Sequence, residues 1–335
     1  MIFLTILFLF SAVLCGLGLI ILSRILSPSF LAARMNARSN HVVAARQIGG
    51  LALIPSILAA VLIFSPDIEL PLRLLTCLTG ASILLWLIGA LDDRYELSEK
   101  IRLGSQVAAA CAVLYGLGPE FRILPALLPH WLEATMIVFT LLVAINVTNF
   151  MDGLDLMTVT GLGIPMAGIA LLANLGFAGA SSGGLGAIIA GGLLGFAFLN
   201  APPARIFLGD SGSLPLGLMA GTVLVMLARE THIVVALILP LYYVLDAGTT
   251  IIMRLLQGEN ILKAHSKHAY QSAKRAGWSV AKVVAHITAL NVVLTGCAVA
   301  LMALDHPLAQ LAFFLIAVVA TLVLLLDFRG RFRKL

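Results

Sequence analysis

The chain has 335 residues, of which 61% are hydrophobic and 11% are charged, and its formal net charge is +5. A soluble domain carries about a quarter charged residues, so this composition excludes an ordinary soluble globular protein, and we expect no nucleic-acid partner behind the basic balance. Apolar runs of about 20 residues recur along the chain, each long enough to cross the ~30 Å hydrocarbon core as a helix. We therefore expect a bundle of membrane-spanning helices, because lipid offers backbone polar groups no other partner.

The apolar runs predict eleven membrane-spanning helices, with ten as the alternative count. We expect one all-α, polytopic membrane domain over residues 1–335, because no low-complexity linker divides the chain. The first run lacks a basic start and a clear cleavage site, so we interpret it as a span and not as a signal peptide. The expected spans are 1–22, 48–65, 70–91, 103–118, 132–148, 156–174, 184–199, 213–228, 232–253, 281–303 and 308–326.

The distribution of Lys and Arg predicts how these spans are oriented. With eleven spans the termini lie on opposite sides, and one set of connections holds 18 of the 21 basic residues. The other set holds Arg73, Arg122 and Arg229. Since basic loops stay in the cytoplasm, we expect the N-terminus outside and the C-terminus inside. The expected cytoplasmic loops are about 23–47, 92–102, 149–155, 200–212 and 254–280.

Five aspartates lie at predicted cytoplasmic helix ends from three separate segments. They are Asp92 and Asp93, Asp152 and Asp155, and Asp210. An acid at the membrane boundary is costly unless water, a metal or a cation compensates it, so this cluster indicates a bound cation. Mg²⁺, which favours carboxylates and phosphates together, fits best. The alternative is that these acids merely terminate helices and stay solvated.

The first of these segments offers two adjacent acids and a lysine. Asp92 and Asp93 point in different directions, so they can divide proton transfer and charge organisation between them. Lys100 lies seven residues beyond Asp93, on the same face if the helix continues, where it could meet a phosphate. The alternative is an i, i+4 pair between Lys100 and Glu96.

The second and third segments carry groups suited to a nucleotide sugar. Asn146, Asn149, Asp152 and Asp155 recur every third residue, and Asn side chains both donate and accept hydrogen bonds, as recognition of a uracil or a sugar requires. In the third segment, Asp210 is the candidate metal ligand, and Phe207 is the ring expected to stack on a base.

The fourth segment contains two histidines, and a sixth candidate acid lies before it. His265 and His268 share a helical face at i, i+3; beside Lys267 they fit pyrophosphate binding better than zinc, and the alternative is that they are simply solvated. Asp246 falls inside the expected span 232–253. Asp246 either faces the same site as the other candidate acids or pairs with a neighbouring helix, and the sequence leaves both possibilities open.

These four segments, in this order, resemble the polyprenyl-phosphate N-acetylhexosamine-1-phosphate transferase family, which is glycosyltransferase family 4-like. That family includes the phospho-MurNAc-pentapeptide transferase of peptidoglycan synthesis. The similarity covers nearly the whole chain. In the first cytoplasmic loop, Asn36, Arg38, Ser39 and His41, followed by Arg46-x-x-Gly49-Gly50, resemble the family's entry motif.

The resemblance implies a role for each matching residue. Asp92 would be the base for the lipid phosphate, and Asp93 and Asp210 would ligate Mg²⁺, with Mn²⁺ as a substitute. Phe207 would stack on uracil. Asn200 and Asp155 would line the nucleotide pocket, and Arg46 would bind the substrate. Asp152, Asn149 and Lys100 would hold the catalytic cluster and the phosphates. His265 and His268 would contact the pyrophosphate or help to place the metal.

The sequence departs from the family pattern in two places. The usual His-rich cluster of the family is reduced here to His265 and His268, with Tyr270 and Gln271. Leu156 stands where family members commonly have Gly, after the Asp-Gly-Leu-Asp run 152–155. The His265-x-x-His268-Ala-Tyr-Gln form resembles the branch that begins O-antigen or other surface-polysaccharide synthesis, which includes enzymes that take 6-deoxy-N-acetylhexosamines.

The resemblance implies transfer of an N-acetylhexosamine-1-phosphate from a UDP-sugar to undecaprenyl phosphate, with release of UMP. Whether the reaction takes one step or passes through a phospho-enzyme stays open. The expected place is the bacterial inner (cytoplasmic) membrane, with the active site on the cytoplasmic face and the lipid bilayer as a partner, and related enzymes imply a homodimer. The alternatives are a transporter or flippase, a CDP-alcohol phosphotransferase, and a catalytically inactive scaffold homologue.

Overall fold

The computed structural model describes residues 2–27, 29–31, 45–260, 266–304 and 306–330, and these residues form helices and no strand. A single extended pairing joins Arg46 to Ile206 in this part of the chain. The elements are α1 (Ile2–Ile25), α2 (Gly49–Phe64), α3 (Leu72–Tyr95), α4 (Glu99–Leu117), α5 (His130–Met151), the π-helical turn η1 (Val159–Gly163), α6 (Ile164–Asn174), α7 (Ala180–Asn200), α8 (Asp210–Glu230), α9 (Ile233–Ile238), α10 (Leu241–Leu256), α11 (Ala269–Arg275), α12 (Val280–Ala303) and α13 (Pro307–Phe328).

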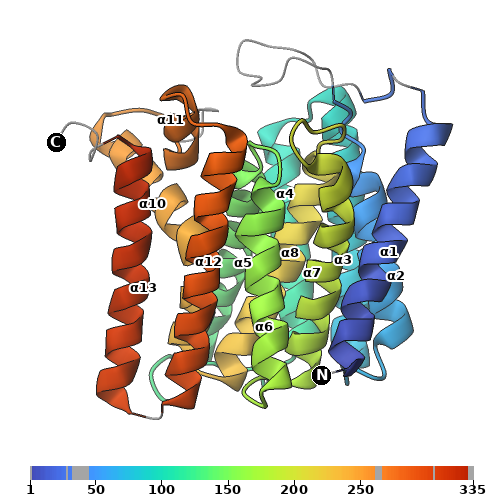
Figure 1. Cartoon of the computed structure of the whole chain (residues 1–335). Helices are drawn as coiled ribbons and strands as arrows, with labels where there is room; N and C mark the ends of the chain where they lie inside the picture. Colours follow the sequence, from blue (N-terminus) through green and yellow to red (C-terminus); the bar gives the residue numbers. More distant parts are fainter. Residues whose placement is uncertain (1, 28, 32–44, 261–265, 305, 331–335) are drawn as a thin grey trace.

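The long helices run side by side as one bundle, with the start of α1 at one end and the end of α13 at the other (Figure 1). Among the described residues, seven helices are long and apolar enough to cross a membrane: α1, α3, α5, α7, α8, α12 and α13. The helix α2 and the segment 159–174 are apolar but shorter. The expected class, an all-α multi-pass membrane protein, is confirmed.

Each expected span overlaps a helix, and the main difference lies in the segment 232–253. This apolar run forms two helices, α9 and α10, which are separated at Leu239 and Pro240. Proline has no backbone N–H to continue the ladder and its ring clashes with the preceding turn. The run is therefore continuous in hydropathy and interrupted in structure.

Helix α8 lies at the centre of the bundle. In its most apolar 18-residue window 94% of the residues are buried, against 28% in α1 and in α13, which therefore face the lipid. Helices α3 and α5 both pack against α8. The carboxyl ends of α3 and α5 thus meet the start of α8 at the end of the bundle where α13 ends, which we call the site end.

The loop before α8 is held by the start of α2. Phe207 N donates to Arg46 O at 2.8 Å, and the first two amides of α2, on Gly49 and Gly50, donate to Phe207 O and Leu208 O at 2.9 Å each. A Cβ on Gly50 would lie 2.2 Å from the backbone nitrogen of Gly212. The paired glycines after Arg46 are therefore required by this close approach, which fixes the wall of the site.

Candidate active site

The first turn of α8 is capped by a carboxylate from another helix. Asp93, in the last turn of α3, accepts hydrogen bonds from Asp210 N at 2.8 Å and from Ser211 N at 3.0 Å. The first amides of a helix have no partner within the helix, and its positive end favours an anion. Asp93 therefore joins the end of α3 to the start of α8. Both of its oxygens, which were expected to bind metal, already accept backbone hydrogen bonds.

Asp92 is tied to a cation that the sequence analysis did not single out. Its Oδ1 accepts from Leu97 N at 2.6 Å and its Oδ2 accepts from Arg102 Nη1 at 2.9 Å. The same Arg102 nitrogen lies 3.7 Å from Asp210 Oδ2. Arg102 thus links Asp92 and Asp210 across two helices.

Lys100 was expected to share a helical face with Asp93 if the helix continued, and the helix does not continue. Helix α3 ends at Tyr95, Glu96 takes a left-handed conformation with φ 54°, and α4 begins at Glu99. Lys100 is exposed in the first turn of α4. The turn between the two helices brings Arg102 to the acids instead, and no spacing rule along one helix could have found it.

Asn149 fastens the end of α5 to the start of α8. Its Nδ2 donates to Asp210 Oδ1 at 2.7 Å and to Ser213 Oγ at 2.9 Å. Asp152 follows at the end of α5 and accepts a hydrogen bond from Thr158 Oγ1 at 2.5 Å. Burial raises the pKa of Asp152 to about 6, the Thr158 hydroxyl opposes this, and the charges of Asp93 and Asp155 add to it. The cluster therefore carries a carboxyl that changes its protonation near neutral pH.

Asp155 and Asn200 were expected to line the nucleotide pocket, and both hydrogen-bond to the backbone of the loops around it. Asp155 Oδ2 accepts from Ala204 N at 3.0 Å. Asn200 Oδ1 accepts from Leu156 N at 2.7 Å, and its Nδ2 donates to Ile206 O at 2.9 Å. Leu156 has φ 59°, in the left-handed region that favours glycine. The Asn200 bond thus holds a leucine in a conformation that explains why glycine is common at this position in the family it resembles.

A polar cavity of about 210 Å³ opens between these segments. Five of the predicted site residues line it: Asn149, Asp152, Asn200, Phe207 and Asp210. The other lining residues are Gln47, Gly153, Leu154, Leu208, Gly209 and Ser213. Gln47 and Ser213 were not predicted; the signal for Gln47 was its place inside the Arg46–Gly50 motif, where it was treated as a spacer.

Three predicted site residues lie elsewhere, and one cannot be placed. Arg46 donates to Leu26 O at 3.1 Å and to Ser23 O at 3.2 Å, so its guanidinium caps the end of α1. Lys100 is exposed, and His268 is buried, at 2% exposure, with Nδ1 3.6 Å from Asp246 Oδ1. None of these three side chains lines the polar cavity. His265 and the motif residues Asn36, Arg38, Ser39 and His41 lie outside the described residues.

The carboxylates fit a metal site only of a particular kind. Within the described part of the chain, no three or more His, Cys, Asp or Glu side chains converge to hold a metal ion. Yet the charges of Asp92, Asp93, Asp152 and Asp210 act on one another, and Arg102 lies near only two of these acids, Asp92 and Asp210, so the carboxyl groups of the cluster outnumber the guanidinium that pairs with them. Mg²⁺ is often held by one or two carboxylates and by substrate phosphates. The donor set fits that arrangement and does not fit an all-protein cage.

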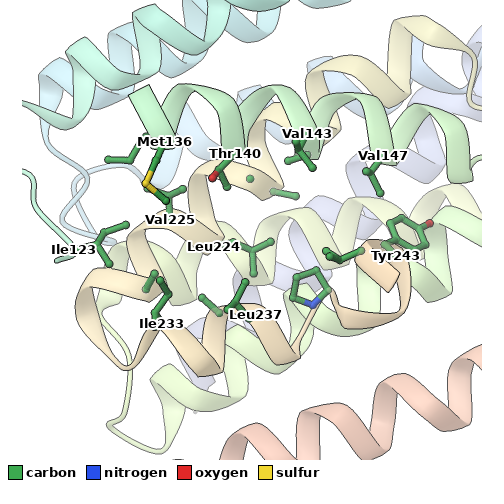
Figure 2. Close-up of a pocket in the computed structure, with 18 of the residues that line it drawn as sticks. Ile123, Met136, Thr140, Val143, Val147, Leu224, Val225, Ile233, Leu237 and Tyr243 are labelled. Carbon is green, nitrogen blue, oxygen red and sulfur yellow. The ribbon is translucent and has the colours of Figure 1, made fainter. Parts of the chain in front are cut away.

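An apolar cavity of about 210 Å³ lies within the bundle, between α5, α8, α9 and α10. In Figure 2 it follows α5 from Met136 to Val147, with Leu224 and Val225 of α8 and Leu237 of α9 across from them. Thr148, the last lining residue on α5, directly precedes Asn149 of the polar cavity. The two cavities therefore approach each other at the end of α5.

The family model and the relatives that this chain resembles all describe transferases. The model of glycosyl transferase family 4 matches residues 75–228. The chain is 28% identical to a probable undecaprenyl-phosphate N-acetylglucosaminyl 1-phosphate transferase of Bacillus subtilis, over 70% of this chain and 66% of that protein. It is 32% identical to a phospho-N-acetylmuramoyl-pentapeptide-transferase of Acetivibrio thermocellus over 49% of both chains. It is 28% identical to a decaprenyl-phosphate N-acetylglucosaminephosphotransferase of Mycobacterium leprae, over 74% of this chain and 71% of that protein.

The matches to the first two relatives span less than two thirds of their lengths. The segment 75–228 runs from α3 to the last turn of α8, and so contains every aspartate of the cluster together with Arg102, Asn149 and Phe207. Residues outside it, among them Gln47, Asp246 and His268, belong to parts of the fold that this family model does not cover.

Proposed function

We propose that the chain is a polyprenyl-phosphate N-acetylhexosamine-1-phosphate transferase of glycosyl transferase family 4, which transfers an N-acetylhexosamine-1-phosphate from a UDP-sugar to undecaprenyl phosphate and releases UMP. The observation that carries this proposal is that a polar and an apolar cavity approach each other at the end of α5. A charged, hydrophilic donor suits the polar one, and a lipid chain suits the apolar one.

The donor is assigned to the polar cavity. Phe207 offers a partly exposed ring for the uracil, and Gln47 and Asn149 offer carboxamides that donate and accept. Asp155 and Asn200 order the loops around the donor, because they hydrogen-bond to the backbone of Leu156, Ala204 and Ile206, and Asn200 also lines the cavity itself. The proposed sugar is an N-acetylhexosamine, which includes the 6-deoxy forms.

The lipid acceptor is assigned to the apolar cavity along α5. Its wall is almost wholly aliphatic, and the sequence of residues from Met136 to Thr148 leads toward Asn149 and Asp210. A prenyl chain in this cavity would bring its phosphate to the aspartate cluster while its isoprene units stay out of water.

Mg²⁺, with Mn²⁺ as a substitute, is proposed as the cofactor. Asp210 would hold it together with substrate phosphates, with Asp152 and Asp93 close by. When bound, the ion supplies charge neutralisation and polarisation of phosphoryl oxygens. Arg102 serves the same electrostatic purpose from the protein side, because it already lies between Asp92 and Asp210.

The proposed reaction is a phosphoryl displacement. An oxygen of the lipid phosphate forms a bond to the β-phosphorus of the UDP-sugar, the bond from that phosphorus to the bridging oxygen breaks, and UMP leaves with that oxygen. The pyrophosphate linkage is thereby conserved in the lipid product. A phosphate monoester has a second pKa of about 6, so the nucleophile is largely ionised without a base. Asp92, whose two oxygens accept from Leu97 and Arg102, contributes mainly by positioning Arg102.

We further propose the expected membrane placement. The eleven spans are α1 to α5, η1 with α6, α7, α8, α9 with α10, α12 and α13, with the site end in the cytoplasm and the start of α1 outside. The bacterial inner membrane is the proposed location, and surface-polysaccharide synthesis, such as that of O-antigen, is the proposed context. A homodimer stays a prediction.

The test is UMP release by the purified protein in detergent. The assay supplies undecaprenyl phosphate, Mg²⁺ and a panel of UDP-N-acetylhexosamines that includes 6-deoxy forms. We expect UMP release that requires the lipid and is lost with EDTA and in Asp210→Ala. A folded protein that binds the lipid and releases UMP from no donor would contradict the proposal and would favour a transporter or an inactive homologue.

A further inference from the structure

Asp246 is a buried carboxylate that the proposed reaction does not use. It lies in α10 and is 0% exposed. On its own helix it accepts from the hydroxyls of Tyr242 and Thr250, each at 3.3 Å. A buried carboxylate is costly unless it is paired and hydrogen-bonded, so this position needs a reason beyond the packing of α10.

The other partners of Asp246 lie at the start of α11 and at the end of α13, both at the site end of the bundle. Ala269 N, the first amide of α11, donates to Asp246 Oδ1 at 2.8 Å. His268 Nδ1 lies 3.6 Å from the same oxygen, and Arg329 Nη2, at the end of α13, lies 3.9 Å from it. Arg329 also donates to Thr249 and Thr250 of α10 at 3.0 and 3.1 Å. Asp246 is therefore the point where α10, α11 and α13 are joined.

Helix α11 has seven residues, which is too short to be stable by itself. Its place in the fold must come from its contacts, and Asp246 supplies the one at its start. Tyr270, one residue further on, is 0% exposed, and its ring stacks on His268 with centroids 5.8 Å apart. Burial raises the pKa of Tyr270 well above its usual value, so its hydroxyl remains a donor.

Tyr270 carries the contact from α11 to the candidate active site. Its hydroxyl donates to Phe150 O at 3.3 Å, one residue beyond Asn149 and two before Asp152. A Cβ on Gly153 would lie 2.1 Å from the Tyr270 hydroxyl oxygen, so the segment after α5 packs directly on this ring. A series of contacts thus runs from Asp246 through α11 to Phe150 and Gly153, which flank Asn149 and Asp152 of the polar cavity.

We infer that Asp246 is a positioning residue, which holds α11 in place so that Tyr270 supports the segment 149–153 and keeps Asn149 and Asp152 in their catalytic geometry. The inference rests on the proposed function for its catalytic meaning. The anchoring itself is a property of the fold and can be measured without a substrate.

The experiment compares Asp246→Ala and Asp246→Asn with Thr222→Val in the full-length protein. Thr222 is a matched control, because it is also buried, at 0% exposure, and its hydroxyl donates to Leu218 O at 2.8 Å within its own helix, α8. Hydrogen exchange of residues 269–275 reports the anchoring, and UMP release reports turnover. Asn keeps the size of Asp and an acceptor for Ala269 N–H, whereas Ala keeps neither.

We expect faster exchange confined to 269–275 in Asp246→Ala, with kcat lowered by up to about 100-fold, as a displacement of about 1 Å can cause. The KM for the UDP-sugar should change less than kcat does, because Phe207 and Gln47 stay in place and Asn149 is the one proposed donor-binding side chain that shifts. Asp246→Asn should keep more of the turnover, and it carries the test if the Ala variant does not fold. Thr222→Val should match the wild type.

Wild-type exchange of 269–275 in Asp246→Ala would overturn the inference. So would exchange that rises evenly through the bundle, because that result indicates a general loss of stability. If the wild type releases no UMP from any donor, the proposed function fails, while the exchange measurement still decides whether Asp246 anchors α11.

Discussion

At the scale of single residues, the site depends on how one guanidinium is shared. Arg102 Nη1 contacts carboxylates of both α3 and α8, at 2.9 Å from Asp92 and 3.7 Å from Asp210. Adjacent like charges would otherwise push the start of α8 away from the end of α3. The pairing leaves Asp210 facing the cavity, where a phosphate or a cation can reach it.

Replacing Arg102 by Met should lower kcat for UMP release by about 100-fold, because removing one charge leaves Asp92 and Asp210 to repel each other and displaces the cluster. Steady-state kinetics of the purified variant measure this. Arg94→Met is the matched control, because Arg94 is exposed in the last turn of α3, two residues after Asp92, and lies over the ring of Tyr95. Equal activity of Arg102→Met and the wild type would remove Arg102 from the machinery.

The raised pKa of Asp152 predicts that the stability of the metal-free protein depends on pH. Its pKa of about 6 in the folded protein lies above the ordinary value of 3.8. Such a carboxyl stabilises the fold fully below pH ~3.8, and that contribution is lost as the pH rises through ~6. In EDTA, Asp152→Asn should therefore melt at a higher temperature than the wild type at pH 7.5, and the gap should shrink by pH 4.5. A gap that stays constant with pH would show that Asp152 is not the titrating group.

The sequence located most acids of the site but not their partners. Asp92, Asp93, Asp152 and Asp210 were found because acids at helix ends are conspicuous in an apolar chain. Arg102 and Gln47 were missed, since a turn after Tyr95 and a bridge to Ile206 bring them in. Contacts of that kind depend on three-dimensional register, which spacing along one helix does not contain.

At the scale of elements, helix order follows from the apolar runs because a membrane imposes a span length. The backbone contacts between the helices, in contrast, do not follow from the apolar runs. A Cβ on Gly89 of α3 would lie 2.3 Å from Asp210 O, whereas one on Gly80 of the same helix would meet nothing within 4 Å. The approach of α3 to α8 thus depends on one glycine near the site.

Gly89→Ala should lower UMP release by at least about tenfold, because the added methyl group forces α3 from the start of α8 and disturbs the Asp93 cap. Gly80→Ala adds the same methyl group to the same helix and should keep the wild-type rate. The two variants are compared in one assay at saturating substrates. Loss of activity in both, or in neither, would mean that the contact between α3 and α8 does not set the geometry of the site.

At the scale of the whole molecule, a polar and an apolar cavity approach each other at the end of α5, where Thr148 of the apolar cavity precedes Asn149 of the polar one. The sequence predicted the polar half through its motifs, while the apolar half was invisible, because residues such as Val143, Leu224 and Leu237 resemble any residues in a membrane helix. The break between α9 and α10 was hidden for the same reason, although Pro240 was its signal.

Filling the apolar cavity should act on the lipid alone. Val143→Trp should raise the KM for undecaprenyl phosphate by about tenfold and leave the KM for the UDP-sugar unchanged, because Val143 lines the apolar cavity and not the polar one. Val292→Trp is the control, since Val292 is 58% exposed on α12 and lines neither cavity. An increase of both KM values in Val143→Trp would indicate general damage, and no change in either would exclude this cavity as the lipid site.

The central claim is that a sugar leaves the donor together with one phosphate. The most direct test is the mass of the lipid formed from undecaprenyl phosphate and the preferred UDP-sugar, measured together with the nucleotide released. We predict a lipid with two phosphates and one N-acetylhexosamine, formed in equal amount with UMP. A lipid with one phosphate and one sugar, formed with UDP, would show transfer of the sugar alone and would contradict the account.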